Sequence, residues 1–262
     1  MKITAIIENT SVQPEIGAEH GLSLYLEIGS RRVLFDAGQT DLLIKNAQAL
    51  NIDLKQVDTV VLSHGHSDHG GGLPAFLEIN RTAPVYASEL CFEPYYNGSE
   101  KYIGLSKKLR CHSQFREVPE IRSLGDGMTL YPGRMVPTPR KVESYGLNVQ
   151  VGGHLMPDHF LHEQYLLVEE NGKRILFSGC SHRGILNIAR HFKPDILVGG
   201  FHFKKLDVQK DQKLLEESAR ALLALPTKYY TCHCTGKEQY DFLKTIMGHR
   251  IEYLSAGTSI SL

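Results

Sequence analysis

Apolar and polar residues follow the same order in two distant stretches of the chain. In residues 24–38, two short, mainly apolar runs flank a glycine and a pair of arginines, which is typical of two strands joined by a tight turn. Residues 166–180 repeat this order at a constant offset, with a glycine followed by Lys173 and Arg174 at the turn. The pattern predicts a chain built from two similar halves.

Both stretches continue alike. A helix and then an apolar strand are predicted for residues 42–50 and 57–62 in the first half, and for residues 185–192 and 196–198 in the second. Each of these strands runs into a histidine, His64 in the first half and His202 in the second. The agreement in element order, basic turn and terminal histidine argues against a chance similarity.

The rest of the chain predicts helices over residues 211–225 and 237–247 and strands over residues 229–231 and 251–254. We expect the α/β class, with two sheets covered by helices in one domain over residues 1–262. Between the halves, residues 91–145 are rich in glycine and proline. An irregular insertion of this length is usually functional, so we predict a lid over the site, with a surface excursion as the alternative.

Charge and composition limit the classes of molecule that the protein is expected to bind. The 29 Lys and Arg residues balance 29 Asp and Glu residues, so no broad basic field attracts nucleic acid or anionic lipid. No apolar stretch approaches the ~20 residues of a membrane helix, and residues 1–4 lead into a strand rather than a signal-peptide core. Five cysteines, an odd number, argue against a disulfide framework. We expect a cytoplasmic protein with a small-molecule partner and no nucleic-acid or membrane partner; homo-oligomer formation is left open.

A dense group of metal-ligand residues follows the predicted strand 57–62. His64 and His66 are two apart on extended backbone and can face one ion, whereas Asp68 and His69, on the turn into a helix, can point to a second. Neutral imidazole and carboxylate suit zinc, which we expect here, or iron(II) or manganese. The alternative, a surface histidine cluster, is disfavoured because this spacing at a strand end is rare in random sequence.

The motif His64-x-His66-x-Asp68-His69 resembles the signature of the metallo-β-lactamase fold superfamily. The resemblance implies a four-layer αββα sandwich of two pseudo-symmetric halves, which agrees with the internal repeat. Three later segments resemble a narrower group that includes the archaeal dihydropterin-ribofuranosylaminobenzene-phosphate synthase, namely residues 179–185, 199–202 and 233–236.

This resemblance implies two divalent metal ions and the residues that hold them. One ion is assigned to His64, His66 and His182, and the other to Asp68, His69 and His233. Asp36 lies in residues 35–38, which look like the first motif of the superfamily, and would support the metal-binding histidines.

Cys180 stands where an orthodox member of the superfamily has an aspartate. We expect its thiol to bridge or support the ions, and the alternative is an inert buried residue. The histidine that such members carry in the preceding loop also has no orthodox counterpart, since only Asp158, His159 and His162 lie there. His182, two residues beyond Cys180, is predicted to take over that role.

Two cations that share a water lower its pKa toward neutrality, so we expect metal-bound hydroxide to attack a carbonyl or phosphorus centre. The predicted catalytic residues are Asp68 and His202, with His202 as proton donor to the leaving group and a structural histidine as the alternative. The basic side chains near the motifs are candidate contacts for an anionic substrate or else solvated charge, namely Arg140, Lys141, Arg183 and Lys204. The isolated histidines are expected to have no role, namely His20, His112, His191 and His249.

The predicted function is therefore a metal-dependent hydrolase of a small, anionic or phosphorylated substrate. A condensing enzyme similar to the pterin synthase is the alternative on the same scaffold. A di-iron redox protein is a third hypothesis, but 262 residues leave no room for the flavodoxin-like domain of such relatives.

Overall fold

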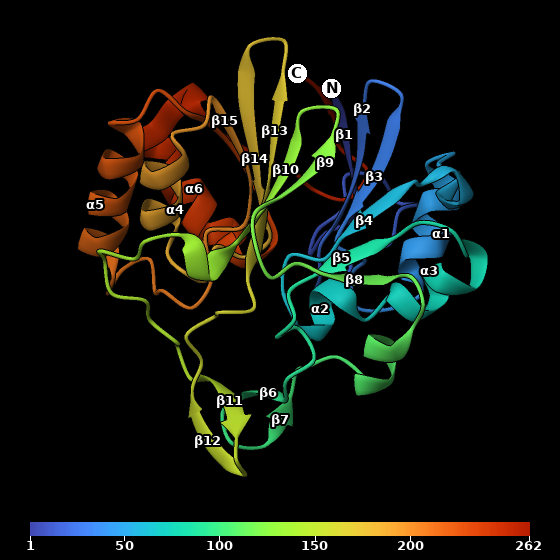
Figure 1. Cartoon of the computed structure of the whole chain (residues 1–262). Coiled ribbons are helices and arrows are strands. Elements are labelled where there is room, and N and C mark those ends of the chain that lie inside the picture. Colours follow the sequence, from blue (N-terminus) through green and yellow to red (C-terminus); the bar gives the residue numbers. More distant parts are fainter.

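The computed structural model describes all 262 residues, and two seven-stranded sheets face each other at its centre (Figure 1). The first sheet has the order β18 (Ser259–Ser261), β1 (Lys2–Ile7), β2 (Ser23–Ile28), β3 (Arg31–Phe35), β4 (Thr59–Val61), β5 (Val85–Ala87) and β8 (Phe115–Glu117). The second has the order β9 (Arg122–Gly125), β10 (Met128–Pro132), β13 (Gln164–Glu170), β14 (Lys173–Ser178), β15 (Ile196–Gly199), β16 (Lys228–Thr231) and β17 (Ile251–Tyr253). At the end away from the termini lies a small third sheet of β12 (His154–Pro157), β11 (Leu147–Val151), β6 (Tyr95–Asn97) and β7 (Lys101–Tyr102) (Figure 1).

The two large sheets repeat one topology. β2 pairs antiparallel with β3, which pairs parallel with β4, and β13, β14 and β15 pair in the same way. The register also repeats, because Val33 lies opposite Leu26 and Ile175 lies opposite Val168. The predicted pair of similar half-chains, with residues 33–35 and 175–177 in equivalent positions, is confirmed.

Helices cover the outer face of each sheet (Figure 1). α1 (Leu42–Ala49) and α3 (Leu73–Ile79) pack on the first sheet, and α4 (Ile185–Phe192), α5 (Gln212–Leu223) and α6 (Lys237–Met247) pack on the second. One apolar core lies between the sheets, where the rings of Phe35 and Phe177 are 5.8 Å apart, and one lies under each helical layer. These three cores define the predicted four-layer αββα sandwich. None of the helices has the length and apolar character needed to cross a membrane.

The predicted lid over residues 91–145 needs correction. β8 extends the first sheet beside β5, and β9 and β10 belong to the second sheet, where β10 pairs with β13. Only β6 and β7 stand apart from the sandwich, and their sheet is completed by β11 and β12 from outside the predicted insertion. β8 and β9 are not predicted because they are short and five of their seven residues are exposed, which obscures the period of two.

Candidate metal centre

The candidate site lies where strands of both large sheets end. A predicted site residue follows each of five strands: Asp36 after β3, His64 after β4, Cys180 after β14, His202 after β15 and His233 after β16. At four such ends, a non-glycine residue has a left-handed backbone with φ between +52° and +61°, namely Asp36, Ser181, His202 and His233. Such residues are uncommon, and they persist where the surrounding structure holds a functional side chain in place.

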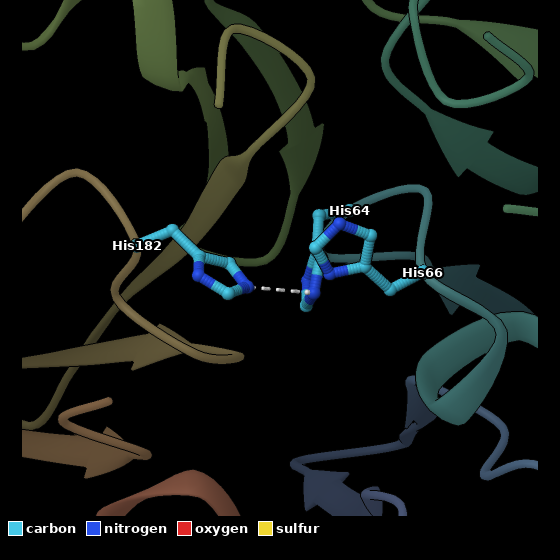
Figure 2. Close-up of side chains that lie close together, drawn as sticks. All are labelled: His64, His66 and His182. Carbon is cyan, nitrogen blue, oxygen red and sulfur yellow. Dashed lines mark hydrogen bonds between the residues drawn. The ribbon is translucent and has the colours of Figure 1, made fainter. Parts of the chain in front are cut away.

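Three imidazoles from the two halves meet in the first ligand group (Figure 2). The Nε2 atoms of His64 and His182 are 3.3 Å apart. The ring centroid of His66 lies 4.6 Å from that of His64 and 5.0 Å from that of His182. All three side chains are buried, and His66 Nε2 has no hydrogen-bond partner. The structure thus brings together the three residues predicted for one ion.

Asp68, His69 and His233 form the second ligand group. The Nε2 atoms of His69 and His233 are 3.2 Å apart, and Asp68 Oδ2 lies 3.2 Å from His233 Nε2. Cys180 Sγ lies 3.2 Å from His69 Nε2, so the thiol adjoins this group. The rings of His64 and His69 are 4.0 Å apart, which places the two groups side by side.

The donor atoms fit a pair of divalent metal ions. In a tetrahedral zinc site, Zn–N bonds of 2.0–2.1 Å place neighbouring ligand nitrogens about 3.3–3.4 Å apart. The Nε2 pairs of His64 with His182 and of His69 with His233, at 3.3 Å and 3.2 Å, have this spacing. Two unprotonated nitrogens repel each other unless a proton or a cation lies between them. The unpartnered Nε2 of His66 supplies a third donor to the first group.

The Asp36 carboxylate contacts Ser63 and His69. Its Oδ1 accepts from the backbone N–H of Ser63, and its Oδ2 lies 2.6 Å from Ser63 Oγ and 2.7 Å from His69 Nδ1. Ser63 Oγ also lies 2.8 Å from His64 Nδ1. Contacts at Nδ1 orient an imidazole and leave the Nε2 lone pair free for a metal.

Three supporting residues were not predicted. Asn9 Oδ1 lies 2.9 Å from His233 Nδ1, and the Glu8 carboxylate accepts from the backbone N–H of His233 at 2.6 Å. His20, expected to have no role, lies with its Nε2 3.3 Å from Asp68 Oδ2. No motif indicates these contacts, because Glu8 and Asn9 directly follow β1, more than 220 residues before His233.

The protonation of the site suits metal binding. Burial, reinforced by neighbouring imidazoles, lowers the pKa of His66 to about 3 and holds the pKa values of His64 and His182 well below the usual range. These rings are neutral, as ligands must be. Burial also acts to lower the pKa of His69, but the Asp36 and Asp68 carboxylates outweigh it and raise that pKa to about 9. A metal ion must therefore displace a proton from His69.

In the loop before β13, Asp158 and His162 lie beside His66 and pair with each other. His162 uses both ring nitrogens, because its Nδ1 accepts from the backbone N–H of Gly65 and its Nε2 lies 3.0 Å from Asp158 Oδ2. His159 is exposed. The neighbouring Glu163 is buried, and its carboxylate accepts from the backbone N–H groups of His182 and Arg183, so it shapes the loop that carries His182.

A cavity of about 490 Å³ opens over both ligand groups. One wall comes from the third sheet and its flanks, with Asn97, Lys101, Tyr102, Ile103 and Leu147, and another contains Lys204 and Lys205. Of the predicted insertion 91–145, only Asn97 and residues 101–103 contribute to the wall of this cavity. The lysines give the cavity a positive charge.

The predicted substrate contacts lie in different places. Lys204 lines the cavity over the ligand groups, whereas Arg140 and Lys141 line a neighbouring cavity. Arg183 is buried, and its guanidinium donates to the backbone carbonyls of His159 and Val136 at 3.1 Å. We therefore withdraw Arg183 as a substrate contact, because its charged group is committed to the packing of a loop.

His202 lies beside His182, with ring centroids 4.3 Å apart, and lines both cavities. Neither of its ring nitrogens has a hydrogen-bond partner. One ligand-type atom from each of His202, Cys180 and Cys234 lies within 4.8 Å of the others. Cys234 was not predicted as a site residue, although it directly follows His233.

Comparison with known proteins identifies the family. Residues 16–230 match the family model of the metallo-β-lactamase superfamily. The chain belongs to this superfamily, and both the resemblance and the sandwich fold inferred from the sequence are confirmed.

Individual relatives extend over nearly the whole chain. A Methanocaldococcus jannaschii protein named 7,8-dihydropterin-6-methyl-4-(β-D-ribofuranosyl)-aminobenzene-5′-phosphate synthase is 28% identical, over 93% of this chain and 90% of its own. An uncharacterized protein of the same organism is 30% identical, over 76% of this chain and 78% of its own. The solved structure of Tm1679, described as a metal-dependent hydrolase of the β-lactamase superfamily, has a TM-score of 0.85 and 31% identity, covering 100% of this chain and 99% of that one. One relative is named a synthase and another a hydrolase, so the names leave the reaction type open.

Proposed function

We propose that this protein is a metal-dependent hydrolase of a small anionic substrate. The observation that carries the proposal is the meeting of six ligand side chains from both halves, with Nε2 pairs at the spacing of a zinc site. The ions are two divalent metals, zinc in preference to iron or manganese. Their ligands are His64, His66 and His182 for one ion and Asp68, His69 and His233 for the other.

When bound, such a pair of ions supplies a nucleophilic water at neutral pH and polarises the oxygen that gains charge. The protein's own residues position the substrate and move protons. Lys101 and Lys204 face the cavity and attract an anionic group. His202, at the cavity wall with two unpartnered nitrogens, is placed to hold a proton for the leaving group.

The size and charge of the site favour a small molecule. A cavity of about 490 Å³ lies within the range of small-molecule sites. The net charge of zero, from 29 basic and 29 acidic residues, also favours a small molecule over a nucleic acid.

The test is hydrolysis of a panel of phosphomonoesters, phosphodiesters and lactones by metal-free protein and by protein reloaded with zinc, manganese or iron(II). We expect metal-dependent hydrolysis of at least one anionic class, lost in His66→Ala and retained in the exposed His112→Ala control. Equal rates with and without metal, or no hydrolysis in any metal form, would overturn the proposal.

A condensing enzyme is the second candidate, and the 28% identity to the named synthase over 93% of this chain favours it. In that case the same ligands promote bond formation between two substrates. Mass spectrometry of incubations with a ribofuranosylaminobenzene phosphate and a dihydropterin whose 6-methyl carbon bears a leaving group, such as a diphosphate, distinguishes the two functions. Joining the two substrates breaks the bond to that leaving group and releases it. A joined product without hydrolysis of the panel supports the synthase and contradicts the hydrolase.

A further inference from the structure

A second cavity of about 440 Å³ adjoins the metal centre. It shares two lining residues with the first cavity, His182 and His202, so these two imidazoles stand between them. Its floor includes the start of α4, at Gly184 and Ile185, and its rim includes Arg140. It thus continues the site beyond the metal ligands.

His182 presents an unpaired polar atom on the side away from the first ligand group. Its Nε2 lies 3.3 Å from His64 Nε2, and its Nδ1, on the opposite edge of the ring, is buried without a partner (Figure 2). The side chain is only 4% exposed. If Nε2 binds a metal, Nδ1 carries the proton, and a buried N–H without an acceptor is costly.

Three of the other four metal-ligand histidines have a partner at Nδ1 that His182 lacks. Nδ1 of His64 meets Ser63, Nδ1 of His69 meets Asp36, and Nδ1 of His233 meets Asn9. For His182 the chain provides no such partner. Both nitrogens of His202, which lines the same second cavity, are also buried and unpartnered. The ring of His202 has the sulfur atoms of Cys180 and Cys234 within 4.8 Å. An acceptor from outside the chain would satisfy Nδ1 of His182.

The start of α4 adds donors to this cavity. Gly184, at the N-cap, offers no side chain, and the first turn holds no acidic residue. Asn187 turns instead to the backbone of Arg140, accepting from its N–H and donating to its carbonyl at 3.0 Å. The first N–H groups of a helix and its dipole favour a negative charge.

The charged side chains that line this second cavity also favour a negatively charged ligand. Lys141 lies on the surface 2.7 Å from the Glu143 carboxylate, so its ammonium group already has an anionic partner. Arg140 has no carboxylate partner and remains the free cation at the mouth of the cavity. Apolar walls from Phe203 and Leu214 leave room for a carbon skeleton.

We propose that this second cavity binds a non-reacting oxyanion group, a phosphate or a carboxylate, carried by the substrate whose reacting group lies at the metal centre. This inference rests on the proposed function and narrows its substrate class. The substrate has two anionic ends. The unpaired donor of His182, the start of α4 and Arg140 receive the distal one.

The test is isothermal titration of the zinc-loaded protein with alkane bisphosphonates of three to six carbons, compared with propylphosphonate. A ligand that reaches both cavities should bind at least about tenfold more tightly than the single phosphonate. Arg140→Gln should weaken the best bisphosphonate about five- to tenfold and leave propylphosphonate unchanged. Lys141→Gln should have a smaller effect, because Glu143 already pairs with it.

Arg190→Gln is the matched control, since it removes the same charge from an exposed residue in the last turn of α4. Zinc content is measured for every variant. Equal weakening by Arg140→Gln and Arg190→Gln, or no bisphosphonate tighter than propylphosphonate, would overturn the inference. Inorganic phosphate that binds in the cavity without any gain from the linked ligands would mean a free anion rather than a substrate group, and it contradicts the proposal too.

These measurements separate the two proposals. Binding does not require turnover, so tight bisphosphonate binding with no hydrolysis of any panel compound would reject the hydrolase alone. Hydrolysis with no bisphosphonate gain would reject the second subsite and leave the hydrolase in place.

Discussion

Replacing Asp36 with asparagine should weaken metal binding although Asp36 is not itself a ligand. The carboxylate is fully buried and lies within hydrogen-bond distance of three groups: the Ser63 N–H, the Ser63 hydroxyl and His69 Nδ1. Asparagine has nearly the same shape and can still accept from the Ser63 N–H. Its amide NH₂ then faces His69 Nδ1, where an acceptor is needed.

The expected loss of metal affinity follows from the tautomer of His69. Facing a donor, Nδ1 must give up its proton, which moves to Nε2, the atom directed at His233 and Cys180. An imidazole protonated at Nε2 cannot bind the ion through that atom. Loss of such an outer hydrogen bond typically lowers metal affinity about 10–100-fold, which corresponds to roughly 1.4–2.7 kcal/mol.

The assay is competition for zinc between the protein and a chromophoric chelator, with circular dichroism melting to show that the variant is folded. The control is Asp41→Asn, whose side chain is 67% exposed and whose contact with Lys45 is 3.9 Å long. We expect one of the two zinc affinities, that of the group containing His69, to fall in Asp36→Asn and both to be unchanged in Asp41→Asn. Wild-type affinities within twofold in a folded Asp36→Asn protein would refute the reasoning.

Three further predictions follow from the same contacts. Asp68→Ala should release one ion and retain the other, so metal analysis should give half the wild-type content; full retention would remove Asp68 from the ligands. His202→Ala should lower turnover about 10²–10⁴-fold with the metal content kept, whereas His182→Ala should lose metal first. Metal loss in His202→Ala with full metal content in His182→Ala would exchange the roles of the two residues. In the metal-free protein, the pKa of His66 is lowered from 6.5 to about 3. At pH 5 the His66 ring therefore takes up a proton when the protein unfolds. This uptake should lower the free energy of unfolding by about 2 kcal/mol. The pKa of His69 is raised from 6.5 to about 9, so its contribution is full below pH 6.5 and lost as the pH rises to 9. Chemical denaturation should therefore show maximal stability near pH 6.5–7, and a flat profile from pH 5 to 9 would contradict both shifts.

The fold was predictable where the pattern of the chain is local. The two strand pairs and the helices 185–192 and 237–247 follow from short-range periodicity, and the structure places α4 and α6 over these residues. β10 could not be recognised in the same way, because its partner β13 lies more than 30 residues further along. Such pairing depends on contacts that a local pattern does not contain.

The residues of the candidate site likewise fall into those that a local sequence pattern predicts and those that it does not. The motif from His64 to His69 is contiguous, so it can be recognised from the sequence alone. The internal repeat indicates where the corresponding strands of the second half end. Asn9 and Glu8 contact His233 only because β1 and β16 end at the same place, which no spacing reveals. The backbone geometry at Asp36 and His202 was equally hidden, since neither residue type requires a positive φ.

The most direct test of this account is anomalous diffraction at the zinc edge from crystals of the zinc-loaded protein. We predict two peaks in each chain. One should lie among the Nε2 atoms of His64, His66 and His182 (Figure 2). The other should lie among Asp68, His69 and His233. No peak after zinc loading, or a single peak elsewhere in the chain, would contradict the central claim that these six side chains form a two-metal site.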